Sequence, residues 1–219
     1  MELIQYAFTA VLISVLLAAS AAFTVMGMGK VRRRRRLARQ AHEHGLKFFP
    51  EDPYDVPRRY ADFAVISSGH SPCANNVTSG GVGARPVRAF DFRCELGHGT
   101  RRLTRLYSVA VGEARRDLGT LLMWHTGDAD LAPLAARGAA LAVGPWSCIG
   151  SPDLARTVQH ACQALADARP SIEVRGPVVL VAAPVSRSVR NYALGVEDMG
   201  AILDAMEKHK AIAKEPAAR

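Results

Sequence analysis

The sequence predicts an α+β protein, in which an N-terminal transmembrane helix precedes an antiparallel sheet with helices packed on one face. Three observations support this prediction. The stretch Leu3–Met28 contains no charged residue. The middle of the chain holds short segments in which apolar and polar residues alternate, as in half-buried strands. The last third adds apolar residues at helical spacing on either side of a further hairpin. Strands and helices segregated along a chain in this way are typical of α+β domains.

The uncharged stretch is long enough to cross a bilayer. About 20 residues of helix, at about 1.5 Å each, span the roughly 30 Å of hydrocarbon. A secretory signal peptide would have a basic start, a shorter apolar core and a small-residue cleavage site. Ala18–Ala22 is similar to such a site, but Glu2 is the only charge before the core, and the core is too long. We therefore expect residues 1–29 to form a transmembrane helix.

A run of cations follows the apolar stretch and accounts for most of the net charge of +8. Its members are Lys30, Arg32, Arg33, Arg34, Arg35, Arg36 and Arg39. Removing these seven from the 28 basic residues leaves 21, against 20 acidic residues. The rest of the chain is therefore nearly neutral and lacks the basic surface of a nucleic-acid-binding domain. We expect no nucleic-acid partner.

The position of the cationic run predicts the orientation of the chain. Basic residues that flank a membrane helix stay on the cytoplasmic side. We therefore expect a single-pass protein of the inner (plasma) membrane, with its N-terminus outside and its C-terminal domain in the cytoplasm. Anionic lipid headgroups attract such cations by about 1 kcal/mol each, so we expect all seven to contact the membrane surface. The helix either continues through this basic stalk, residues 30–45, or breaks near Gly27 and Gly29.

A stripe of small residues lies at i, i+4 spacing within the membrane span: Ala10, Ser14, Ala18 and Ala22. Small residues let two membrane helices approach closely. The stripe lacks the glycines of the stronger motif, and alanine is common throughout the chain. A homodimer formed through this stripe is one interpretation, and composition alone is the other.

Residues 46–210 are expected to form the cytoplasmic domain, and residues 211–219 a flexible tail. Pro50, Pro53 and Pro57 exclude a regular helix at the start of the domain, and the aromatic residues there indicate an ordered wrap against it. Strands are expected at residues 73–78, 86–96, 102–114 and 120–125, with the glycine-rich residues 79–84 as a hairpin tip.

Two side-chain patterns are predicted in detail. In the second of these strands, Phe90, Phe92 and Cys94 share the buried face, whereas Asp91 and Arg93 share the opposite face. Near the end of the chain, a helix capped by Ser151 is expected from Pro152 to about Ala168. A hairpin that turns at residues 176–177 follows, and a final helix covers about residues 189–210.

Three stretches of the chain carry a resemblance: "GLKFFPEDPYDVPRRYADF", "SSGHSPCANNVTSG" and "RPVRAFDFRCELGHG". Through them, this part of the chain resembles an uncharacterised group of bacterial single-pass membrane proteins with a small cytoplasmic domain. The likeness covers about residues 45 to 110 and, more loosely, "IEVRGPVVLV". It implies a membrane-anchored domain, and it implies no activity or catalytic residue, because none is assigned to that group.

One set of side chains has the composition of a zinc site: His70, Cys73, Cys94 and His98. The expected register argues against it. If the hairpin closes around residues 79–85, Cys73 lies opposite residue 90 or 91, and Cys94 is roughly 10 to 13 Å further along the strand. Because Cys94 shares the buried face, we expect it to be a small core residue. We therefore expect no bound metal.

No catalytic motif is intact in the sequence. Ser147 in "GPWSCIG" lacks the two flanking glycines of a nucleophile elbow. The stretch "SGGVGARP" lacks the Gly-Lys-Ser/Thr of a phosphate loop. We expect no cofactor, and we expect free thiols because the cytoplasm is reducing. The arginines of "TRRLTRLY" have two interpretations, a solvated charge cluster that protects a strand edge or a second contact with anionic lipid.

Two functions from different classes fit the sequence. The first is a membrane-tethered interaction or scaffold domain without catalytic activity. The second is a sensor or enzyme that acts on a small ligand or metal at the membrane surface. A polar pocket gathering His70, His98, His125 or Asp128 would favour the second, whereas an apolar groove would favour the first.

Overall fold

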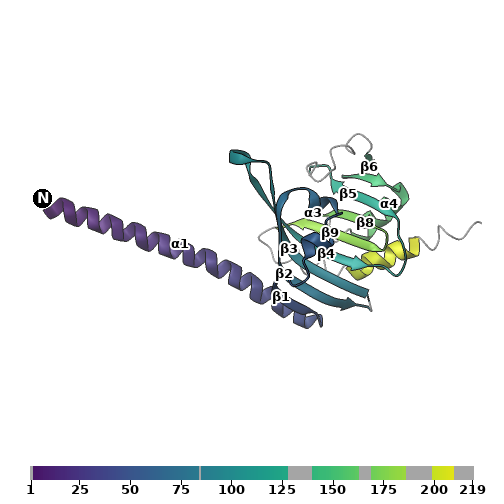
Figure 1. The fold of residues 1–219 in the computed structure, drawn as a ribbon, viewed down its shortest axis with the longest axis horizontal. Coiled ribbons are helices and arrows are strands. Elements are labelled where there is room, and N and C mark those ends of the chain that lie inside the picture. The colour runs from purple at the N-terminus through teal and green to yellow at the C-terminus, as the bar shows by residue number, and fades with distance from the viewer. Residues whose placement is uncertain (1, 84, 128–139, 163–168, 186–198, 210–219) are drawn as a thin grey trace, which may run out of the picture.

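The computed structural model describes residues 2–83, 85–127, 140–162, 169–185 and 199–209. It confirms the predicted fold class, because a long N-terminal helix is followed by an antiparallel sheet and further helices (Figure 1). Nine strands of the described residues form one sheet in the order β1-β2-β3-β4-β9-β8-β5-β7-β6. The strands are β1 (Lys47–Glu51), β2 (His70–Val82), β3 (Arg85–Leu96), β4 (Leu103–Glu113), β5 (Thr120–His125), β6 (Leu141–Val143), β7 (Trp146–Gly150), β8 (Ser171–Arg175) and β9 (Val178–Pro184).

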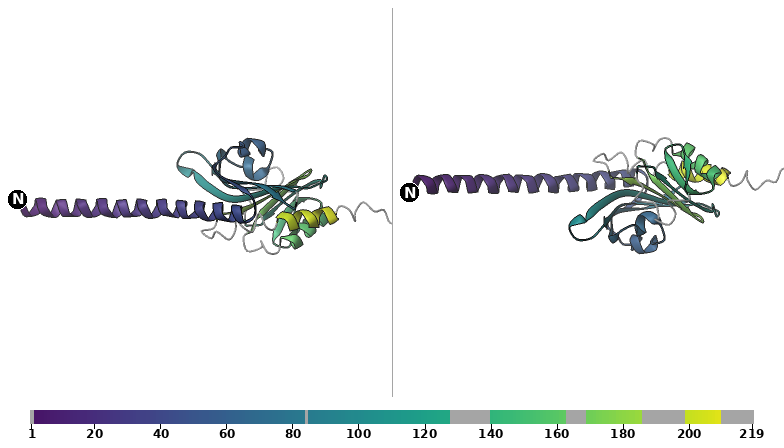
Figure 2. Two further views of the ribbon diagram at one scale, coloured as in Figure 1. Left: turned by 90° about the horizontal axis from the view of Figure 1, so that it is seen from below. Right: turned by 90° about the horizontal axis from the view of Figure 1, so that it is seen from above.

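Helix α1 (Glu2–Glu43) contains both the apolar stretch and the basic run. Of the two expected arrangements, it continues through Gly27 and Gly29 and does not break there. At about 1.5 Å per residue the helix is about 63 Å long. The described residues contain one helix that is long and apolar enough to cross a bilayer, and this is α1. Its apolar part projects away from the sheet (Figure 2).

Most of the predicted strands are confirmed. β2, β3 and β4 contain or closely match the three predicted segments, and β5 covers residues 120–125 as predicted. β8 and β9 form the predicted hairpin around residues 176–177. The two phenylalanines at positions 90 and 92 and the thiol of Cys94 are fully buried, as the alternation predicts.

Three strands are not predicted. β1 lies in the proline-rich segment that was expected to wrap around the domain, and it pairs with β2 at the edge of the sheet. Its proline, Pro50, has no partner in that register, which an edge strand tolerates because the missing N–H faces away from the ladder. β6 is only three residues long. β7 contains the buried Trp146 and Cys148 in the stretch that was compared with a nucleophile elbow.

The β2–β3 hairpin closes more tightly than the sequence predicts. Residues 79–82, expected in a flexible tip, belong to β2, and Val82 pairs with Arg85. Gly83 supplies the positive φ, 56°, that the short turn requires. A Cβ on Gly80 would lie 2.5 Å from Leu46 Cδ2. The absence of a side chain at Gly80 therefore lets Leu46 pack against the backbone of β2. The predicted register of the hairpin was therefore wrong.

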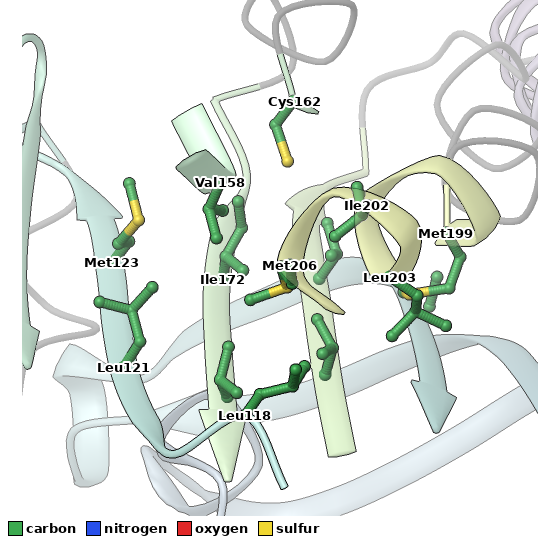
Figure 3. Close-up of a cluster of buried hydrophobic side chains, with 14 of the residues drawn as sticks. Leu118, Leu121, Met123, Val158, Cys162, Ile172, Met199, Ile202, Leu203 and Met206 are labelled. Carbon is green, nitrogen blue, oxygen red and sulfur yellow. The ribbon is translucent and has the colours of Figure 1, made fainter. Parts of the chain in front are cut away.

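Each face of the sheet buries its own apolar core. One core joins Leu37 and Ala41 of α1 to α4 (Pro152–Ala161) and to the helix at residues 199–209. Figure 3 shows part of this core, including Val158 of α4 and Met206 of the last helix. The other surrounds Phe90 and Phe92 and includes the single-turn helices α2 (Val56–Arg59) and α3 (Ala64–Ser67). The longer helices thus pack on one face as predicted, and two short helices cover the opposite face (Figure 2).

The two C-terminal helices are described over part of their predicted lengths. Ser151 caps α4 as predicted, because its Oγ accepts a hydrogen bond from the Leu154 N–H. The described helix covers Pro152–Ala161 with Cys162 at its C-cap, and residues 163–168, up to the predicted end near Ala168, lie outside the described residues. Of the final predicted helix, residues 199–209 are described as helical. Its start and the predicted tail at 211–219 are not among the described residues.

Candidate functional site

The last turns of α1 pack directly against the edge of the sheet. Leu37 and Ala41 are buried there, with exposed fractions of 0% and 2%, beside Leu46. They lie four residues apart, so they share one side of the helix. The segment that follows the membrane span is therefore part of the folded domain and is not a separate stalk.

An ion pair connects the basic run to β3, the third strand of the sheet. Arg33 Nε lies 3.1 Å from Asp91 Oδ2, and Arg33 Nη2 lies 2.7 Å from Asp91 Oδ1. Both side chains are about one-fifth exposed. Asn76 Nδ2 donates a third hydrogen bond to this carboxylate, over 2.8 Å. A bidentate guanidinium–carboxylate pair fixes both distance and angle, so this contact orients α1 on the sheet.

Asn76 reaches the carboxylate because of a bulge in β2. The register of β2 and β3 shifts between Asn75 and Thr78, which pair with Asp91 and Ala89. Asn76 has a φ of 52° at this bulge. Asparagine adopts this left-handed conformation more readily than most residues do. The pair of adjacent asparagines in an expected strand was the signal in the sequence that could have predicted this bulge.

A pocket of about 560 Å³ lies beside the ion pair, and we refer to it as the juxtamembrane pocket. It is lined by Val31, Arg33, Arg34, Asn75, Asn76, Asp91, Phe92, Arg93, Leu106 and Val185. Leu106 is about half exposed there. The lining combines apolar groups with guanidinium and amide groups, which suits a partner that is apolar at one end and polar or anionic at the other. Of the described histidines that were expected to mark a ligand pocket, none lines this one, and Asp128 lies outside the described residues.

The structure gives the cations of the run different surroundings. The side chains of Arg32, Arg35 and Arg36 are exposed. Arg34 Nη2 lies 3.4 Å from the Pro50 carbonyl oxygen, and Arg39 lies 3.8 Å from Glu43. Arg33 is held by Asp91, whereas the side chain of Lys30 is outside the described part. Contact of the seven cations with the membrane surface stays a prediction, and Arg33 has a second, structural role that the sequence did not predict.

The candidate zinc ligands do not converge on one side of the sheet. Cys73 pairs with Arg93, whose side chain is exposed, so Cys73 points to the face opposite Cys94. The sequence placed Cys73 opposite residue 90 or 91, and the tighter hairpin overturns that register. Burial raises the pKa of the Cys94 thiol, with partial opposition from Ser68 and Arg105.

The two histidines of that set do meet. The rings of His70 and His98 lie edge to face with their centroids 5.1 Å apart. His70 Nδ1 lies 2.6 Å from the Glu95 carbonyl oxygen, so this nitrogen carries the proton and donates. Among the residues that the structure describes, no three His, Cys, Asp or Glu side chains form a group that could hold a metal ion.

Glu173 is a buried carboxylate that sequence reasoning missed. It is only 3% exposed. Its Oε2 accepts a hydrogen bond from the Ala64 N–H at the start of α3, over 2.6 Å, and its Oε1 accepts one from Arg175 Nε, also over 2.6 Å. Burial raises the pKa of Glu173, and the hydrogen bonds from Arg175 and Ala64 partly oppose that rise. Glu173 therefore connects β8 to α3 through a hydrogen bond. It lies on the face of the sheet that is opposite the juxtamembrane pocket.

These features define a class of protein: a membrane-associated protein with one apolar N-terminal helix that is docked, through its basic end, on an α+β domain. No protein-family model and no curated protein matches the chain. It is similar to a solved structure, the crystal structure of the mycobacterial trehalose monomycolate transport factor A, TtfA. The TM-score is 0.59 at 18% identity, over 80% of this chain and 94% of that chain. At this identity the likeness shows a shared fold.

Proposed function

We propose that the protein is a membrane-tethered interaction domain without catalytic activity, which binds a membrane-protein partner at the cytoplasmic face of the inner membrane. Its N-terminus lies outside and its domain inside, as the cations after the apolar stretch favour. Its similarity in fold to a transport factor supports an accessory role in moving a lipid-like molecule.

The docking of α1 on the sheet is the observation that carries this proposal. A flexible linker would let the domain drift from the bilayer. Here one helix runs from the apolar stretch into the domain, and Leu37, Ala41 and the Arg33–Asp91 pair hold it there. The pocket begins at Val31, only a few residues after the apolar stretch ends. This arrangement supports the proposal that the domain meets the cytoplasmic surface of a neighbouring membrane protein.

The chemistry of the juxtamembrane pocket favours binding over catalysis. Among the described residues that line the pocket, Asp91 supplies the carboxylate. It accepts hydrogen bonds from Arg33 and Asn76. A carboxylate held in this way is occupied as a structural acceptor and is poorly suited to take a proton from a substrate. The remaining polar groups are guanidinium and amide groups, which recognise anionic or polar groups.

A small ligand at the same pocket is the alternative. The volume of about 560 Å³ lies within the range of small-molecule sites, roughly 300 to 1,000 Å³. An amphiphile with an anionic head would match Arg34 and Arg93, and its apolar part would match Val31 and Leu106.

A homodimer through Ala10, Ser14, Ala18 and Ala22 is a separate proposal, consistent with the exposure of these side chains on α1.

Photocrosslinking in native membranes tests the proposal. A benzophenone amino acid replaces Leu106 in the full-length protein, and the matched control replaces Leu141 on β6, whose side chain has nearly the same exposure, 50% against 51%. We expect one discrete membrane-protein adduct from position 106 and none from position 141, identified by mass spectrometry. Adducts from position 106 that contain only lipid would contradict the partner proposal and support the amphiphile alternative.

A further inference from the structure

The hairpin formed by β3 and β4 projects beyond the rest of the sheet. The pairing of these strands extends to Leu96 and Leu103. The tip, residues 97–102, includes the short 3-10 helix η1 (Gly99–Arg101). Figures 1 and 2 show the hairpin reaching from the sheet toward the side on which α1 runs to its N-terminus. The tip therefore points in the direction of the apolar part of α1.

The tip carries both cationic and apolar groups on its surface. Arg101 and Arg102 are exposed, and Leu103 is 50% exposed. Arg102 Nη1 lies 3.4 Å from Glu95 Oε2, while its side chain stays 61% exposed. Leu103 therefore presents an apolar surface beside two exposed cations at the end of the hairpin. The same combination suits the interface of a bilayer, where the leucine enters the acyl boundary and the arginines meet anionic headgroups.

We propose that the tip of the β3–β4 hairpin is a second membrane contact, which binds anionic lipid headgroups through Arg101 and Arg102 and places Leu103 in the bilayer interface. The inference depends on α1 spanning the membrane, but not on the identity or existence of a protein partner. With the basic run of α1 it gives the domain two points of contact. A single helix allows the domain to rotate about its axis, whereas two contacts fix one orientation against the surface.

The juxtamembrane pocket lies between these two contacts. Val31 and Arg34 contribute to it from α1, and Arg93 and Leu106 contribute from the hairpin. Engagement of the tip would therefore hold this pocket next to the headgroups and limit its access from the cytoplasm.

Depth-dependent fluorescence quenching tests the proposal on the full chain in vesicles. An environment-sensitive NBD label is attached to Leu103→Cys in a Cys73→Ser background, because the other three cysteines are buried. The control carries the label at Leu141→Cys, which is equally exposed, at 50%, on the edge strand at the far end of the sheet from β1. In vesicles of phosphatidylcholine and phosphatidylglycerol, we expect doxyl lipids to quench the label at position 103 and not at position 141.

Charge variants test which residues are responsible. Replacing Arg101 and Arg102 with Gln should lower the ratio of molecules with the tip in the bilayer interface to molecules with the tip in water, by on the order of tenfold. The matched control replaces Arg115 and Arg116 with Gln, an exposed pair of the same charge just beyond the other end of β4, and should change nothing. Equal quenching at positions 103 and 141, or none at 103, would overturn the contact. Quenching at 103 that is the same in pure phosphatidylcholine would overturn the role of the arginines.

Discussion

Arg33 and Asp91, 58 positions apart, form a bidentate ion pair that connects the basic part of helix α1 to β3, the strand between β2 and β4. Each side chain remains only about one-fifth exposed. The pair therefore lies between the exposed ion pairs that contribute little to stability and the buried pairs whose disruption is costly. It makes the orientation of the domain depend on a residue that the sequence assigns to the membrane surface.

The contribution of this pair can be measured with a double-mutant cycle. We expect Arg33→Gln and Asp91→Asn each to lower the free energy of unfolding by about 1 to 2 kcal/mol, with a coupling energy of similar size. Arg32→Gln, at the exposed neighbouring position, is the control. Urea titration in detergent, followed by tryptophan fluorescence, is suitable because Trp124 and Trp146 are both buried in the domain. Additive losses would show that the two side chains do not interact in solution.

The orientation in the membrane predicts the activity of reporter fusions. A reporter that works only in the cytoplasm should be active when fused after Arg219, because the cations that follow the apolar stretch stay inside. Replacing Arg32–Arg36 with Gln should give a mixed orientation. Activity of a periplasm-only reporter at the same fusion point would show that the proposed orientation is wrong.

The two faces of β3 should differ in their sensitivity to mutation. Phe92 is fully buried, so Phe92→Ala should cost about 3 to 5 kcal/mol. Arg93 is exposed on the other face, and Arg93→Ala should cost within about 0.5 kcal/mol. Asp91 shares the face of Arg93, but its ion pair with Arg33 should make Asp91→Ala more costly than Arg93→Ala. The same urea titration measures all three variants, and equal losses at positions 92 and 93 would refute the assigned faces.

Glu173 should make stability depend on pH in a defined direction. Burial raises the pKa of its carboxyl above the ordinary value of 4.5. The folded protein therefore holds this proton to a higher pH than the unfolded chain does, and the contribution of Glu173 to stability falls as pH rises through the raised pKa. Glu173→Gln, which keeps an acceptor for the Ala64 N–H, should gain stability relative to wild type as the pH rises above about 4.5 and through the raised pKa.

The control for this prediction is Glu43→Gln, which removes a carboxylate that is more than half exposed. Its difference from wild type should depend less on pH than that of Glu173→Gln, because folding leaves the Glu43 side chain more than half exposed. A pH-independent difference for Glu173→Gln would mean that Glu173 is ionised at the same pH in the folded and unfolded protein.

The cysteines should differ in reactivity. None of the four, all of which the structure describes, forms a disulfide bond. Cys73 is partly exposed, whereas Cys94 and Cys148 are buried, and burial raises the pKa of both thiols. Because the thiolate is the reactive form, maleimide should label Cys73 rapidly in the native protein and the others only after denaturation. Intact-mass spectrometry counts the labels, and rapid labelling of Cys94 would contradict its place in the core.

Patterns within single segments predicted much of the fold. The alternation of Phe90, Asp91 and Phe92 and the cap at Ser151 are local signals, and the structure confirms both. Register was not predictable in the same way. It depends on where a hairpin closes, and residues 79–82 were mistaken for a loop because their glycines suggest flexibility. Position 80 requires a glycine because Leu46, far away in sequence, packs against it.

The candidate site was harder to predict because its parts come from distant segments. Each residue of the pocket has an ordinary explanation on its own: Arg33 as one of several cations, Asp91 as a solvent-facing strand residue, Leu106 as an apolar residue in a strand. Their combination follows from the packing of α1 across β1 and β2. The candidate metal residues show the converse, since their spacing in sequence suggests a site and the sheet separates Cys73 from Cys94.

The sequence by itself determined the long apolar helix, the cationic run and the α+β class, because hydropathy, charge and period are properties of contiguous residues. Only the tertiary structure decided what the cations face. Asp91 selects Arg33 from five consecutive arginines because the packing of Leu37 and Ala41 sets the rotation of α1, and a helix turns by about 100° per residue. One residue of rotation would bring a different guanidinium to the carboxylate, and no local pattern encodes that angle.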